Sequence, residues 1–132
     1  MKKNKYEISL WEDILKEEIK DGNGEVLTPA HYEEEKICVI GSSSMTSPSR
    51  AVEPRLVQNV NGTNTLTFKL FYTYIDNETG EKVQNPYISL MVNERKVKCF
   101  WEDDWYDFVV KGIQEDSAGK SITYICSDIF IN

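Results

Sequence analysis

The sequence predicts a mainly β fold, namely a small antiparallel β-barrel or sandwich with one or two short helices. Apolar and polar residues alternate over residues 65–75, which is the pattern of a strand with one buried face. Aromatic residues make up 11% of the chain and gather in its second half, and such side chains pack well on a pleated surface. Turn-forming residues recur between the apolar segments at a spacing typical of all-β domains.

The chain length predicts a single domain. With 132 residues, one β-rich domain over residues 1–132 is the natural count, and a chain of this size can bury a proper core. The apolar end, Ile129-Phe130-Ile131, is unusual for a natural terminus. We therefore expect an N-terminal domain of a longer chain.

The first 60 residues are less regular than the rest. Strands are predicted over residues 6–10, 36–40 and 55–60, and the serine-rich segment 41–54 is predicted to be an exposed loop. Residues 11–35 leave alternatives open. Their apolar spacing fits a helix, whereas the Asp-Gly and Asn-Gly dipeptides within them are typical of a hairpin turn. We favour extended structure with a long loop.

The second half predicts a meander of strands. After the strand over 65–75 and a turn over 76–80, residues 85–91 fit a short helical turn that begins at Asn85-Pro86. Further strands are predicted over 95–101, 105–111 and 121–126, with a β-bulge at Gly112. Asp128 is predicted to be the N-cap of a final helical segment.

The charge balance excludes several classes of partner. Asp and Glu number 22 against 15 Lys and Arg, and the formal net charge is −7. Binding to duplex nucleic acid or to an anionic membrane requires the opposite balance. Cys38, Cys99 and Cys126 are not close in sequence, so we predict small buried thiols rather than a disulfide framework or a zinc site. No segment resembles a signal peptide or a membrane span.

Catalysis is not predicted. His31 is the only histidine and has no recognisable nucleophile near it in sequence, so we expect a solvated loop histidine. The acidic runs 33–35 and 102–104 lack the spacing of a glycosidase pair or a calcium loop, and we interpret them as solvated hairpin tips. We therefore predict no catalytic residue, no metal site and no cofactor.

The aromatic residues around one predicted hairpin allow two interpretations. Cross-strand aromatic pairs usually pack a core or a subunit interface, and we favour that interpretation, with Trp105→Ala costing roughly 3–5 kcal/mol. The alternative is a platform for stacking carbohydrate. The residues concerned are Trp101, Trp105, Tyr106 and Phe108.

Residues 61–132 carry a pattern of turns and apolar positions rather than a catalytic motif. The pattern consists of a glycine turn at 61–64, the strands 66–70 and 96–98, and the segments 87–92, Trp105-Tyr106-Asp107-Phe108-Val109-Val110, Ile113-Gln114-Glu115-Asp116 and 127–132. In this pattern the chain resembles the first domain of bacteriophage baseplate hub and tail-tip proteins, the tail-associated or prophage endopeptidase-type proteins of long-tailed phages.

The resemblance implies a β-barrel-like structural domain without enzymatic activity. In such hubs the copies form a ring, commonly a trimer, that docks on the distal tail protein, and the protein is assembled in the host cytoplasm into the virion tail. The alternative function is a receptor- or carbohydrate-binding β-sandwich module. The candidate assembly contacts are Ser43, Met45, Arg50, Trp101 and Trp105.

Overall fold

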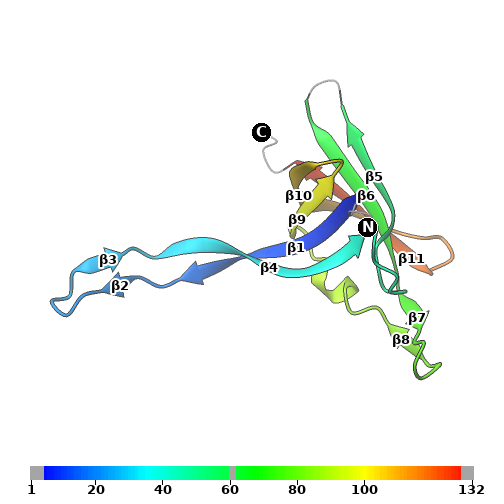
Figure 1. Ribbon diagram of the computed structural model, residues 1–132, viewed down its shortest axis with the longest axis horizontal. Helices are drawn as coiled ribbons and strands as arrows, with labels where there is room; N and C mark the ends of the chain where they lie inside the picture. The colour runs from blue at the N-terminus through cyan, green and yellow to red at the C-terminus, as the bar shows by residue number, and fades with distance from the viewer. Residues whose placement is uncertain (1–4, 60–61, 129–132) are drawn as a thin grey trace.

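The computed structural model describes residues 5–59 and 62–128, which form one seven-stranded antiparallel sheet and two small ribbons (Figure 1). The strand order in the sheet is β4-β1-β9-β10-β11-β6-β5. The prediction of a mainly β fold is confirmed. The strands of the sheet are β1 (Tyr6–Lys16), β4 (His31–Ser42), β5 (Val52–Gln58), β6 (Asn64–Phe71), β9 (Lys96–Trp101), β10 (Asp104–Glu115) and β11 (Ser121–Asp128). The ribbons pair β2 (Ile19–Lys20) with β3 (Val26–Thr28), and β7 (Thr73–Ile75) with β8 (Lys82–Gln84).

One face of the sheet carries the core. Alternate residues of β6 are fully buried, as the period-two pattern predicts, and each lies opposite a buried residue of β11. The pairs are Leu66 with Cys126, Phe68 with Tyr124, and Leu70 with Ile122. The same face continues through Phe108 and Val110 on β10, Val97 and Cys99 on β9, and Ile8 and Leu10 on β1. Burial of each large side chain contributes about 1.5–3 kcal/mol.

The sheet does not close into a barrel. Its two outer strands approach each other at one place, where the backbone N–H of Ala51 donates a 2.7 Å hydrogen bond to the carbonyl of Ile40 on β4. Ala51 directly precedes β5 and is fully buried. The neighbouring Gly41 is also buried, and a Cβ atom built there would lie 2.9 Å from the Cβ of Ala51. Glycine is therefore needed for this close approach.

The prediction of an exposed loop over residues 41–54 is wrong at both ends. Gly41 and Ser42 finish β4, and residues 52–54 belong to β5. Between them, Ser49 is buried, and its carbonyl accepts a 2.9 Å hydrogen bond from the buried side chain of Asn85. Polar composition predicted exposure, but backbone groups that find buried partners can be drawn into the fold.

The predicted helical turn after Asn85 is present as a single 3-10 turn, Ile88–Leu90, and the described residues include no α-helix. Asn85 Oδ1 accepts a 3.0 Å hydrogen bond from the N–H of Tyr87, which starts the turn. Asp128 is the last residue of β11, where its carboxylate accepts a 2.6 Å hydrogen bond from the N–H of Asn64. The helical segment predicted after it lies outside the described residues.

The predicted bulge is confirmed, and so is the predicted burial of two of the three cysteines. The register between β10 and β11 shifts between Val110 and Gly112, which is the predicted bulge. Cys99 and Cys126 are fully buried and Cys38 is half-buried, all as free thiols. Burial raises the pKa of the Cys99 and Cys126 thiols to about 12, so both remain protonated at neutral pH.

Candidate assembly surface

A long hairpin projects from the sheet. The pairing of β1 with β9 ends at Trp11 opposite Lys96, whereas β1 and β4 stay paired out to Lys16 opposite His31. Residues 12–35, here called the arm, therefore form a two-stranded ribbon that continues through β2 and β3 (Figure 1). No arm residue belongs to the core or packs against it. Such a ribbon is only marginally stable by itself in water.

The tip of the arm is a turn set by Asp21. Its carboxylate accepts hydrogen bonds from the N–H groups of Asn23 and Glu25, at 2.8 and 3.0 Å. Gly24 lies in the left-handed region with φ of 83°, where glycine is favoured. Of the alternatives for residues 11–35, the strand–turn–strand is therefore the one observed. The helix is wrong. Of the favoured interpretation, the extended structure is observed and the long loop is not.

The arm exposes apolar side chains. Leu15 and Tyr32 face each other across the ribbon, and the other apolar residues lie near the tip. Exposed apolar side chains that gather on one element are typical of an interaction site rather than of ordinary surface. The exposed fractions are 54% for Leu15, 57% for Ile19, 50% for Val26, 65% for Leu27 and 68% for Tyr32.

The arm also carries the whole net charge of the protein. It contains nine of the 22 Asp and Glu residues but only two of the 15 Lys and Arg residues, a formal charge of −7. The other residues therefore carry 13 acidic and 13 basic groups and are neutral overall. Sequence analysis missed this site, although the uneven distribution of charge is visible in the sequence and is the signal that identifies it.

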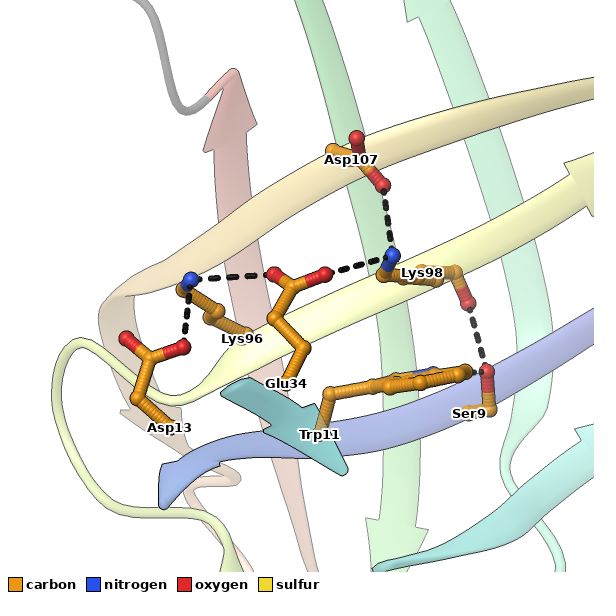
Figure 2. Close-up of polar contacts among 7 residues, drawn as sticks. All are labelled: Ser9, Trp11, Asp13, Glu34, Lys96, Lys98 and Asp107. Atoms are coloured by element: carbon orange, nitrogen blue, oxygen red, sulfur yellow. Dashed lines mark hydrogen bonds and ion pairs between the residues drawn. The ribbon is translucent and has the colours of Figure 1, made fainter. Parts of the chain in front are cut away.

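An ionic network fastens the base of the arm to the sheet. Glu34 on β4 reaches across β1 to β9, where its two carboxylate oxygens each lie 2.9 Å from a lysine Nζ atom, one of Lys96 and one of Lys98 (Figure 2). Lys96 also contacts Asp13 at 2.8 Å. Charged hydrogen bonds of this length are stronger than neutral ones. The hydrogen bond from Lys98, and then that from Lys96, lowers the pKa of Glu34.

The ring of Trp11 packs against the same ionic network. The Nζ atom of Lys98 lies 4.5 Å from the ring centroid of Trp11, a favourable cation–π distance. Trp11 Nε1 donates a 2.9 Å hydrogen bond to the hydroxyl of Ser9, which donates in turn to the carbonyl of Lys98 at 3.3 Å (Figure 2). The outer face of the sheet thus holds the arm at a defined position.

Replacing Glu34 with glutamine is expected to lower the free energy of unfolding by about 1 kcal/mol at pH 7. The folded-state pKa of Glu34 is depressed, so its contribution is present above the unfolded pKa and lost as the pH falls through the folded value. Urea unfolding at pH 7 and pH 3 should therefore show a smaller difference from wild type at pH 3. Glu53→Gln is the matched control, since the Glu53–Lys69 pair is isolated and the Glu53 side chain is 67% exposed. An equal loss in both variants would contradict a role for the network.

The acidic run 33–35 was predicted to be a solvated hairpin tip. This prediction is wrong, because the run is part of β4. Glu35 pairs with Lys16 across the ribbon at 2.9 Å. His31 is also a strand residue rather than a loop residue. It is exposed, with Nδ1 2.9 Å from the carbonyl of Pro29 and Nε2 3.6 Å from Glu33. Among residues 5–59 and 62–128, no group of three or more His, Cys, Asp or Glu side chains is placed to hold a metal ion.

Two of the three residues predicted as assembly contacts in the serine-rich segment make hydrogen bonds within the chain itself. Ser43 is exposed, and its hydroxyl accepts a 2.6 Å hydrogen bond from the N–H of Lys5. Met45 is half-buried. Arg50 is half-buried and donates to the carbonyl of Ser47 at 2.9 Å. None of them lies in the arm.

The two predicted tryptophans lie on opposite faces of the sheet. Trp101 is half-buried on the core side, with its ring centroid 5.9 Å from that of Tyr6. Trp105 is 57% exposed, and its ring contacts Phe100 at 5.2 Å between centroids. Of the two sites predicted for Trp105, the core is therefore wrong, and a subunit interface stays a prediction.

Comparison with known proteins found no matching family model, no matching curated protein and no matching solved structure. In the part of the chain that the structure describes, no helix is long and apolar enough to cross a membrane.

Proposed function

We propose that this chain is a structural domain of a bacteriophage tail tip, a baseplate hub component without enzymatic activity. In this proposal, copies form a ring, commonly a trimer, that docks on neighbouring tail proteins such as the distal tail protein. The ring is assembled in the host cytoplasm and resides in the virion tail. The resemblance of residues 61–132 to tail-tip proteins suggests which assembly the chain belongs to. The observation that supports a role in assembly is the arm.

The arm supports this role because the domain does not need it for its own core. A ribbon that leaves five large apolar side chains at least half exposed gains stability when another protein covers them. The ionic network at its base holds the ribbon in one direction, which lowers the entropy cost of docking. A projecting element with an uncovered apolar surface suits a protein that docks on other proteins.

A carbohydrate-binding module is the second candidate, favoured by the exposed Trp105 beside Phe100. The other aromatic residues weigh against it. Phe108 is fully buried and Trp101 packs against the core, while the hydroxyl of Tyr106 accepts a 3.1 Å hydrogen bond from Gln58. One exposed ring, Trp105, beside the half-buried Phe100 offers less stacking surface than the predicted platform of four rings.

The mass of the protein in solution tests the proposal. Light scattering should find a trimer or a larger ring for this chain or for the full product of its reading frame. A strict monomer in both forms contradicts the hub role, and selective binding in a glycan screen would then favour the second candidate.

The arm itself is tested by shortening it. Asn-Gly in place of residues 17–30 would join Lys16 to His31, which already face each other across the ribbon, through a favourable hairpin turn. The shortened protein should keep its thermal midpoint within roughly 4 °C, because no core residue is removed. A collapse of stability would show that the arm serves the fold rather than assembly.

A further inference from the structure

We infer that the arm docks in a basic groove with an apolar floor on a different protein, and not on a second copy of this chain. The inference rests on the proposed assembly role and names the chemistry of the partner. It combines the distribution of charge with the position of the exposed apolar side chains.

The charge distribution disfavours a second copy as the partner. The carboxylates at the base of the arm are partly offset by Arg95, Lys96 and Lys98 of the sheet, whereas residues 17–30 keep a formal charge of −3. The residues outside the arm sum to zero, so a second copy offers no net positive charge to receive the tip. Two arms brought together would repel each other at distances up to the Debye length, about 8 Å at physiological ionic strength. Complementary potentials are the rule at specific interfaces, and a basic partner is what complements the arm.

The ion pairs within the arm leave its tip acidic. Lys16 is paired with Glu35 and Lys20 with Glu18, at 2.9 and 3.4 Å. The carboxylates of Glu17 and Glu25 form no ion pair with any residue in the described part of the chain. These two carboxylates stand on either side of the turn and are available to cations of a partner.

The apolar residues at the tip lie close to these carboxylates in sequence. Ile19 follows Glu17 by two residues, and Val26 and Leu27 follow Glu25 directly. All three apolar side chains are at least half exposed. An anionic membrane or a nucleic acid would be repelled by the carboxylates, whereas a protein groove can offer both an apolar floor and a basic rim.

Three synthetic peptides test this chemistry on the full chain. Alternating Leu-Lys forms a strand with one apolar and one cationic face, alternating Leu-Glu reverses the charge, and alternating Ser-Lys removes the apolar face. Fluorescence anisotropy should show that Leu-Lys binds at least about tenfold more tightly than Leu-Glu, with Ser-Lys between them and weakened most by salt.

Variants assign the binding to the tip. Glu17→Gln with Glu25→Gln should weaken Leu-Lys binding severalfold, whereas the matched control, Glu78→Gln with Glu81→Gln on the β7–β8 hairpin, should leave it unchanged. Val26→Ser with Leu27→Ser should weaken Leu-Lys binding and spare Ser-Lys binding. All three double variants alter exposed residues, so folding should be unaffected and is checked by circular dichroism.

Three outcomes would overturn the inference: equal binding of Leu-Lys and Leu-Glu, an equal loss in the control variant, or self-association that the Val26→Ser and Leu27→Ser changes abolish. The last outcome would assign the tip to a second copy. If the protein forms a ring but does not bind Leu-Lys, this inference alone is overturned. If the protein is a monomer that binds Leu-Lys selectively, only the proposed hub role is overturned.

Discussion

Replacing Phe108 with alanine is expected to lower the free energy of unfolding by about 3–5 kcal/mol. Phe108 is fully buried near the middle of the sheet, on β10 opposite Val97 of β9. Its ring also stacks on that of Tyr106, with 6.4 Å between centroids. Truncation would leave a cavity that neighbouring strands, held by their hydrogen bonds, cannot collapse to fill. Urea denaturation followed by circular dichroism measures the loss.

Trp105→Ala is the matched control on the same strand. Trp105 lies three residues before Phe108 on the other face of the sheet and is 57% exposed. Its ring contact with Phe100 is the main interaction that truncation removes, so the loss should be about 1 kcal/mol or less. The opposite order, with Trp105→Ala the more destabilising change, would mean that the faces of β10 are assigned the wrong way round.

The error over Trp105 shows where sequence reasoning ended. The strand over 105–111 was predicted correctly because alternation identifies a strand. Alternation does not show which face is buried when both faces carry large apolar residues. In this strand Trp105 and Val109 lie on one face, and Tyr106, Phe108 and Val110 lie on the other. The buried face is the one on which Phe108 lies opposite Val97 and Val110 lies opposite Cys126. These two partners belong to other strands, so the local pattern of β10 does not identify them.

The arm was missed for a related reason. Its apolar residues follow neither a strict helical nor a strict strand period, so local pattern left a helix, a loop and a hairpin open. The contacts that hold its base, such as Glu34 with Lys96, join residues 62 positions apart and are invisible to local analysis. What the sequence does show is the Asp-Gly-Asn-Gly turn and the excess of carboxylates on both sides of it.

Gly41→Ala is expected to destabilise the fold by about 1–3 kcal/mol. The new Cβ would lie 2.9 Å from the Cβ of Ala51 and 3.3 Å from its carbonyl oxygen, so backbone must move. That movement strains the 2.7 Å hydrogen bond between Ala51 and Ile40, through which the segment before β5 meets β4. Gly22→Ala in the tip of the arm is the control, since a Cβ there meets nothing within 4 Å.

A double-mutant cycle separates this clash from the general effect of adding a methyl group to a strand. Ala51→Gly removes the nearer of the two obstacles, so Gly41→Ala should cost less in the Ala51→Gly background than in the wild type. Chemical denaturation of the four proteins gives the coupling energy. A coupling of zero would mean that the cost of Gly41→Ala does not come from the close approach of Gly41 to the side chain of Ala51.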